Sequence, residues 1–235
     1  MLDYKKIAHL IGSSKKKTPA KLFLRGNLVE KDFTRSKFEY FGDGKFWVLI
    51  GDYAPINKWL QKNKKKVSSF HWEIHARNSA LPLADLTKFQ ARIEPGAIVR
   101  TGAKIGKGCV IMMGAVINIG AVIGEKTMVD MNAVIGARAK IGKRCHIGAG
   151  AVIAGVLEPP SKRPVKIEDG VLVGANAVIL EGVKIGKKSV IAAGAVVIKN
   201  IPPGMVAAGV PARVIKKVSD IKDKSKTKIL EELRG

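Results

Sequence analysis

A repeat of six residues constrains the fold of this chain more than any other feature of its sequence. Between Ile93 and Ile153 every sixth position holds a branched aliphatic residue, and a second run with the same spacing extends from Ile167 to Val197. The fourth position after each of these residues is small or thin throughout the first run, except at Leu157. Neither the 3.6-residue period of a helix nor the alternation of a strand produces this spacing. The repeat therefore predicts a solenoid.

Packing determines the cross-section of such a solenoid. Three hexads form one coil with three flat sides, and the aliphatic residues point into a narrow prism whose coils stack at about 4.8 Å. Only small residues fit the remaining inward position, and glycine supplies the tight corners. Corner glycines recur at Gly102, Gly106, Gly114, Gly120, Gly124, Gly136 and Gly142. The chain is predicted to be mainly β.

Cysteine content and the N-terminal sequence indicate the compartment. Both cysteines, Cys109 and Cys145, fall at inward repeat positions, which predicts buried thiols in a reducing compartment and no disulfide framework. The N-terminus lacks the apolar region and cleavage site of a secretion signal. No apolar run reaches the roughly 20 residues that a membrane span requires. We expect a cytoplasmic protein.

The net charge of +23 raises the question of a polyanionic partner. The lysines are scattered over corners and tails, and no aromatic residues lie among them in the repeat to stack on bases. We interpret the charge as a solvated basic surface and do not expect nucleic-acid binding.

Residues 1–88 lack the hexad and are predicted to form a small α/β domain. His71 and His75 have a spacing that metals use, but no cysteine or third histidine lies nearby, so we interpret them as surface residues. The predicted elements are a helix over 2–11, strands over 21–28 and 38–50 with a turn at Gly42–Gly44, a helix through Trp59, and a helix over 69–77 that begins at Ser69.

The two hexad runs are interrupted between Ile153 and Ile167. These residues are 14 apart, two more than two hexads, and the three prolines between them cannot donate to a strand ladder. We predict that a loop over 154–166 leaves the coil. Because loops on a rigid scaffold commonly carry function, we expect this loop to contribute to a substrate site rather than to be a tolerated insertion.

A more specific resemblance rests on segments spread along the chain: Arg77–Pro82, Ala91–Ala97, Val110–Ala115, Thr127–Asn132, Cys145–Gly150 and Gly155–Pro160. They resemble the tetrahydrodipicolinate N-acetyltransferases of bacterial lysine biosynthesis, a branch of the hexapeptide-repeat acyltransferases. The similarity covers essentially the whole chain, and the strong positive charge is its visible departure.

The resemblance implies an architecture and an assembly. It implies a left-handed parallel β-helix over 89–215, preceded by the small domain at 1–88 and followed by a C-terminal helical tail at 216–235. It further implies a homotrimer with active sites in clefts between neighbouring solenoids, acetyl-CoA as cosubstrate, a small dicarboxylate as acceptor, and no metal.

Acetyl transfer from a thioester to an amine needs a proton acceptor, an oxyanion donor and a held thioester. The candidate catalytic residues are Asp130, His146 and Glu158, in that order. With 18 residues per coil His146 stacks over Met128, which puts the Cα atoms of His146 and Asp130 roughly 8 Å apart. Each candidate could instead be a structural hydrogen-bonding group.

One comparison within the resemblance favours Asp130. It matches an aspartate that contacts the substrate amine in the related succinyltransferase branch. The glutamate which that branch uses in a later coil corresponds here to Val178, and this departure leaves Glu158 or Glu181 for the second acid role.

Residues that bind the acceptor are predicted from its charge. Those that bind CoA are implied by the stretch Ile201–Ile215, which resembles the end of many CoA-dependent hexapeptide transferases, where the nucleotide portion of CoA docks against the last coil. A dicarboxylate calls for cationic partners, and CoA calls for small residues along its pantetheine arm and cations at its phosphates. The N–H groups near Gly148 or Gly174 are candidate oxyanion donors. The substrate-binding candidates are Arg92, Arg138, Lys162 and Arg163, and the CoA-binding candidates are Ala175, Ala193, Gly194, Arg213 and Lys216.

The predicted function is acetylation of the amine of ring-opened tetrahydrodipicolinate, which leads to diaminopimelate and lysine. The alternatives are succinyl transfer to the same acceptor, O-acetyl transfer to serine or a sugar, and a basic scaffold or nucleic-acid-binding solenoid. A hexapeptide-repeat zinc enzyme would need three histidines, and the repeat region contains one.

Overall fold

The computed structural model describes residues 4–156, 163–223, 225 and 232. The chain divides into two compact units, one made of Met1–Leu10 with Pro82–Gly235 and the other of Ile11–Leu81. Helix α1 (Tyr4–Ser13) crosses the boundary between them along the chain. Each unit is described separately below.

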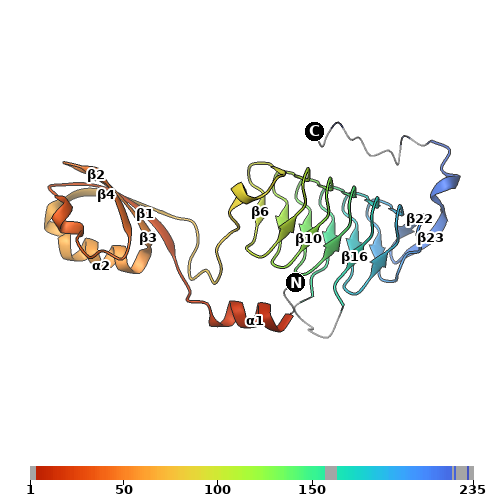
Figure 1. The fold of residues 1–235 in the computed structure, drawn as a ribbon, viewed down its shortest axis with the longest axis horizontal. Coiled ribbons are helices and arrows are strands. Elements are labelled where there is room, and N and C mark those ends of the chain that lie inside the picture. The colour runs from red at the N-terminus through yellow and green to blue at the C-terminus, as the bar shows by residue number, and fades with distance from the viewer. Residues whose placement is uncertain (1–3, 157–162, 224, 226–231, 233–235) are drawn as a thin grey trace. The chain divides into compact units, whose positions relative to one another are not determined.

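The smaller unit is an antiparallel sheet with one helix (Figure 1). Its strand order is β2-β3-β1-β4, and its core joins alternate residues of the strands to the buried side of helix α2 through Leu22, Leu49 and Ile56. The elements are β1 (Pro19–Gly26), β2 (Glu39–Asp43), β3 (Phe46–Asp52), α2 (Tyr53–Asn63) and β4 (Val67–Ile74), with 3₁₀ turns at Glu30–Phe33 and Lys64–Lys66. The predicted α/β character is confirmed.

One predicted element of this unit is wrong. The segment expected to be a helix over 69–77 is strand β4, and Ser69 lies opposite Arg25 of β1 rather than capping a helix. Its valine, phenylalanine, tryptophan and isoleucine favour strands. Pairing with β1 supplies backbone hydrogen-bond partners that stabilise the strand over a helix. His71 and His75 therefore do not share a helical face.

The larger unit is a parallel β-solenoid, which confirms the prediction from the hexad (Figure 1). Its two-residue strands are β5 (Arg92–Ile93), β6 (Ile98–Val99), β7 (Lys104–Ile105), β8 (Val110–Ile111), β9 (Val116–Ile117), β10 (Val122–Ile123), β11 (Met128–Val129), β12 (Val134–Ile135), β13 (Lys140–Ile141), β14 (His146–Ile147), β15 (Val152–Ile153), β16 (Lys166–Ile167), β17 (Leu172–Val173), β18 (Val178–Ile179), β19 (Lys184–Ile185), β20 (Val190–Ile191) and β21 (Val196–Val197). They form three sheets of eight, six and five strands, and the eight-stranded sheet ends in β22 (Met205–Gly209) and β23 (Ala212–Lys217).

The register shows how the loop enters the coil. Lys140 of β13 pairs with Lys166 of β16, so the 14 residues from Ile153 to Ile167 replace a single hexad. The connection therefore holds eight extra residues, not the two that a count of two hexads suggested. The count from the sequence was wrong because the hexad spacing on either side of the prolines does not show which strand the chain pairs with when it returns.

The corners repeat one backbone pattern. The third residue after most of the two-residue strands has a positive φ, in the left-handed region. It is glycine at most of these positions and asparagine, lysine or arginine at the others. Asn132 and Asn176 (φ 57° and 56°) are two such positions on one corner, stacked with Gly114 and Gly150. At these two positions the asparagine side chain lies over the glycine of the coil before it.

The prism interior also contains a column of polar side chains. Cys109, Thr127, Cys145 and Ser189 are fully buried, and each donates to a carbonyl oxygen at a corner of the following coil, at 2.7–3.1 Å. Both cysteines are free thiols, as predicted. Burial raises the pKa of the Cys145 thiol to about 11. These cysteines are structural hydrogen-bond donors.

The three sheets present different outer surfaces. On the six-stranded sheet every outward residue is aliphatic, namely Ile98, Val116, Val134, Val152, Val178 and Val196. On the five-stranded sheet the outward residues are Lys104, Val122, Lys140, Lys166 and Lys184. None of the helices in the described part of the chain could span a membrane.

The C-terminal region differs in part from the predicted helical tail at 216–235. Lys216 and Lys217 belong to β23, which pairs antiparallel with β22, and a 3₁₀ turn follows at Val218–Asp220. Most of the later residues lie outside the described part of the chain. The loop residues Glu158 and Lys162 also lie outside it.

Candidate active site

The corner that follows each strand of the eight-stranded sheet carries a column of stacked residues. Each donates its backbone N–H to a carbonyl oxygen of the next coil at 2.8–2.9 Å, so the column is regular. From the first coil to the last, its members are Glu94, Met112, Asp130, Gly148, Gly174 and Ala192. We call these six residues the corner column.

Asp130 and His146 come together at this column. Met128 pairs in register with His146, and Asp130 follows β11 directly, so the two side chains meet across one rung. His146 Nε2 lies 3.7 Å from Asp130 Oδ2, and the side chains are 29% and 19% exposed. Asp130 Oδ1 accepts the backbone N–H of Met131 at 2.9 Å, which orients the carboxylate. The expected proximity of the two residues is confirmed, and their role in a substrate site stays a prediction.

Beyond Asp130 the corner column consists only of small residues. A Cβ atom at Gly148 would lie 2.8 Å from the backbone nitrogen of Ala175, and one at Gly174 would lie 2.4 Å from that of Ala193. Three rungs separate Asp130 from Ala192, about 14 Å at the strand spacing. The column and its neighbours form a small-residue lane from Asp130 toward the β22–β23 hairpin: Gly148, Ala149, Gly174, Ala175, Ala192, Ala193 and Gly194.

The structure distinguishes among the backbone N–H groups near Gly148 and Gly174 that the sequence offered as oxyanion donors. The N–H groups of Gly148 and Gly174 already donate to Val173 and Ile191 at 2.8 Å, so they are not available to an oxyanion. Within the described residues, the N–H groups one position later, at Ala149, Ala175 and Ala193, have no acceptor. The sequence could not say which N–H group near each glycine is available, because the hydrogen-bond register of the corner is not visible in the hexad.

Two of the predicted cationic partners lie away from the Asp130–His146 pair. Arg92 shares the outward column of the eight-stranded sheet with His146 but lies three rungs from it, about 14 Å. Its Nη1 is 3.5 Å from Glu94 Oε1. Arg163 is exposed, and it lies with Arg138 at the corner after the six-stranded sheet, one side of the prism away.

Arg138 contacts helix α1 and the backbone of Val156. Its guanidinium carbon lies 5.9 Å from the ring centre of Tyr4, and Nη1 donates to the carbonyl of Val156 at 3.3 Å. The adjacent Ile7 of α1 is fully buried. The surroundings of Arg138 therefore indicate that it fastens helix α1 and Val156 to the solenoid.

The CoA candidates lie along one edge of the solenoid. Ala175, Ala193 and Gly194 belong to the small-residue lane, and all three are exposed. Arg213 and Lys216 are exposed on β23, where Arg213 lies opposite Ala208 and Lys216 opposite Val206. The structure thus brings the predicted CoA residues to the end of the lane that is distant from Asp130. No group of three potential metal ligands occurs among the described residues.

Comparison with known proteins extends this picture to the whole chain. Residues 2–86 match the family model described as tetrahydrodipicolinate succinyltransferase N-terminal. Residues 96–118 and 164–199 match the hexapeptide repeat of succinyl-transferase, and residues 120–155 match the bacterial transferase hexapeptide with six repeats.

Curated relatives match over their full length. A 2,3,4,5-tetrahydropyridine-2,6-dicarboxylate N-acetyltransferase of Thermotoga maritima is 63% identical over 100% of this chain and 98% of its own. The chain belongs to the family of tetrahydropyridine-dicarboxylate N-acetyltransferases. The relative of that name from Alkaliphilus metalliredigens is 54% identical over 100% of this chain and 98% of its own. The family predicted from the sequence is confirmed.

Solved structures resemble the chain over a part of it. A mutant of the GDP-perosamine N-acetyltransferase of Caulobacter crescentus, in complex with CoA and GDP-perosamine, is similar over 55% of this chain and 58% of its own, at 28% identity and a TM-score of 0.49.

Proposed function

We propose that this enzyme transfers the acetyl group of acetyl-CoA to the amine of ring-opened tetrahydrodipicolinate, giving N-acetyl-2-amino-6-oxopimelate for diaminopimelate and lysine synthesis. The observation that carries the proposal is the Asp130–His146 pair at the head of a lane of small residues. The acceptor and the acetyl group are supported by the full-length relatives, whose name contains both.

The reaction forms one bond and breaks another. The amine nitrogen attacks the thioester carbonyl carbon, the C–N bond forms, and the C–S bond breaks as CoA leaves with its thiol. The amine proton passes to the Asp130–His146 pair, where Nε2 and Oδ2 lie 3.7 Å apart, and from the pair to the departing sulfur, so that CoA leaves as the free thiol. Glu158 remains a candidate for a second acid role.

The small-residue lane is suited to the two other requirements of the reaction, an oxyanion donor and a binding surface for the thioester. The N–H groups of Ala149 and Ala175 are suited to stabilise the oxyanion, because they are fixed by the coil yet have no acceptor among the described residues. The pantetheine arm of acetyl-CoA lies along Ala175, Ala193 and Gly194, and Arg213 and Lys216 contact its phosphates.

We propose that the site is completed in a homotrimer of left-handed solenoids. The six-stranded sheet is apolar on its outer surface, with Ile98 and Val134 43% and 36% exposed, and it adjoins the corner that carries Asp130. Packing of this sheet against a neighbour would bring the neighbour's Arg163 toward the substrate carboxylates, and Lys162 stays a second candidate from the sequence. The free, buried thiols support a cytoplasmic location.

The test is release of free thiol from acetyl-CoA with a panel of acceptors. Thiol release with tetrahydrodipicolinate, and background rates with serine and sugars, would support the proposal. Release only with serine or a sugar would assign an O-acetyltransferase. No release with any acceptor, together with salt-dependent retention of random DNA, would indicate a nucleic-acid-binding solenoid.

A further inference from the structure

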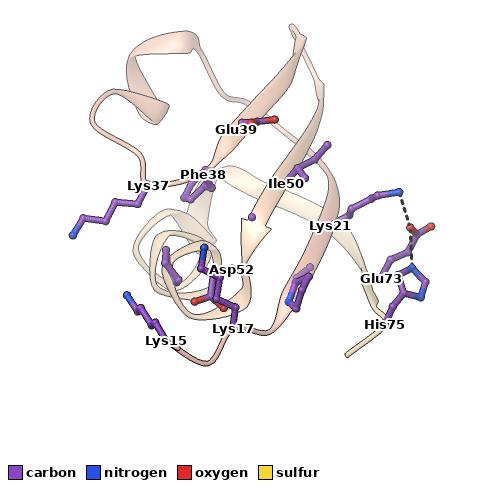
Figure 2. A pocket seen from close by; sticks show the side chains of 14 residues that line it. Lys15, Lys17, Lys21, Lys37, Phe38, Glu39, Ile50, Asp52, Glu73 and His75 are labelled. Atoms are coloured by element: carbon purple, nitrogen blue, oxygen red, sulfur yellow. Dashed lines mark ion pairs between the residues drawn. The ribbon is translucent and has the colours of Figure 1, made fainter. Parts of the chain in front are cut away.

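The smaller unit contains a cavity of about 700 Å³ that the proposed reaction does not use (Figure 2). One of its walls is the linker that follows α1, with Lys15 and Lys17. Another is a row of residues that lie in register across the sheet: Glu39 of β2, Ile50 of β3, Lys21 of β1 and Glu73 of β4. This row lies on the face of the sheet opposite the buried Leu22 and Leu49, so its side chains do not pack into the core.

The charged groups of the cavity fall into two sets. On one side Glu73 is shared between Lys21 Nζ at 3.6 Å and His75 Nε2 at 3.9 Å. In the view of Figure 2 this group lies apart from Lys15 and Lys37. Within the described residues, Lys15, Lys17 and Lys37 make no ion pair with a carboxylate. The cavity thus offers three lysines whose charge its own acids do not neutralise.

The two other acidic residues of the lining, Asp52 and Glu39, supply negative charge. Asp52 Oδ1 accepts the backbone N–H of Thr18 at 2.9 Å, and Glu39 makes no ion pair within the described residues. Four lysines face three carboxylates in the lining, a formal surplus of one positive charge with His75 neutral. Phe38 and Ile50 add apolar surface between the charged groups.

We propose that this cavity binds a small amino dicarboxylate, a molecule with two carboxylates, one ammonium group and a short hydrocarbon body. The carboxylates bind Lys15, Lys17 and Lys37, the ammonium group binds Glu39, and the hydrocarbon packs on Ile50 and Phe38. The net charge of such a ligand, −1, complements the +1 of the lining. The lining residues all belong to the unit Ile11–Leu81, whereas Asp130 belongs to the other unit, so this inference does not depend on the proposed function.

The test uses the full-length protein with a methyl-labelled isoleucine signal. The Ile50 signal, assigned with Ile50→Val, is followed while L-2-aminoadipate is added up to about 10 mM. We expect a saturable shift of this signal. The variant in which Lys15, Lys17 and Lys37 are all alanine should bind at least about tenfold more weakly. Because the reporter lies in the cavity, binding of a dicarboxylate at the solenoid corner does not imitate this result.

Two controls make the outcome specific. Alanine at Lys58, Lys62 and Lys65 removes the same charge from the same unit outside the cavity, and binding should stay within about twofold. Glu39→Gln should weaken L-2-aminoadipate but not adipate, which lacks the ammonium group. An Ile50 signal that does not saturate, or an affinity that falls equally in both triple variants, would overturn the proposal. Unchanged acetyl transfer in the Lys15, Lys17 and Lys37 variant would leave the proposed function standing in either case.

Discussion

His146 Nε2 lies 3.7 Å from Asp130 Oδ2, across a single rung of the eight-stranded sheet. The two residues are 16 apart in sequence, two fewer than a full coil, which is why a strand residue of one coil meets a corner residue of its neighbour. Fixed strands hold both backbones, so the pair is preorganised without a loop. Small residues follow at the same corner in the next coils.

Asp130→Asn should keep the fold but lose turnover. The variant retains the size and one hydrogen-bonding oxygen of the side chain while removing its charge, so kcat should fall by about 10²–10⁴ with the solenoid intact. Steady-state kinetics and light scattering measure both effects. Glu94→Gln is the matched control, because Glu94 occupies the same corner column two coils earlier and should keep near-normal turnover. Near-normal turnover of Asp130→Asn would remove Asp130 from the mechanism.

A larger side chain in the small-residue lane should block acetyl-CoA. Ala175→Leu adds bulk at an exposed position, so the fold should be retained while KM for acetyl-CoA rises by at least about tenfold. Thr101→Leu adds bulk at the equivalent position of a different corner and should leave KM unchanged. Equal KM values for the two variants would show that CoA does not follow the lane.

Thr127→Val should destabilise the solenoid by about 1–3 kcal/mol, since it removes the hydroxyl that bonds two backbone groups inside the prism. Thr127 Oγ1 donates to Gly142 O at 2.7 Å and accepts the N–H of Cys145 at 3.0 Å. Denaturant unfolding at fixed protein concentration measures the change. Cys109→Val, one coil earlier in the same column, removes only a weak thiol donor and should cost less. An equal cost for both substitutions would contradict this role of the hydroxyl.

Glu168 should contribute an acid-sensitive part of the stability. A hydrogen bond from Lys184 Nζ at 3.0 Å holds the pKa of Glu168 below its ordinary value. The folded state therefore binds the proton less readily than the unfolded state, so the stabilisation is complete above the unfolded pKa of about 4.3 and is lost as pH falls through the lower folded pKa.

Thermal unfolding of wild type and Glu168→Gln between pH 3 and 7 tests this dependence. The difference in midpoint should be constant above about pH 5.5 and should shrink toward zero in acid. A difference that grows as the pH falls would have the wrong sign for a lowered pKa.

The sequence predicted the solenoid well because its core is local and periodic. Ile111, Val129 and Ile147 stack in register, as the spacing of six requires, and no distant segment competes for their positions. The strand at Val67–Ile74 was mistaken for a helix because its pairing with β1 is not visible in a short pattern. Only part of the candidate site could be predicted from the sequence. The coil length alone brought Asp130 near His146, whereas the contacts of Arg138 with Tyr4 and Val156 depend on a helix that packs from outside the repeat.

The identity of the acyl group is the central claim. The model matched by residues 2–86 is described as a succinyltransferase, whereas the full-length relatives are named N-acetyltransferases. The most direct measurement compares kcat/KM for acetyl-CoA and succinyl-CoA with tetrahydrodipicolinate as acceptor, followed as release of free thiol. We predict at least a hundredfold preference for acetyl-CoA, about 2.7 kcal/mol in transition-state binding. Equal values, or a preference for succinyl-CoA, would contradict the account.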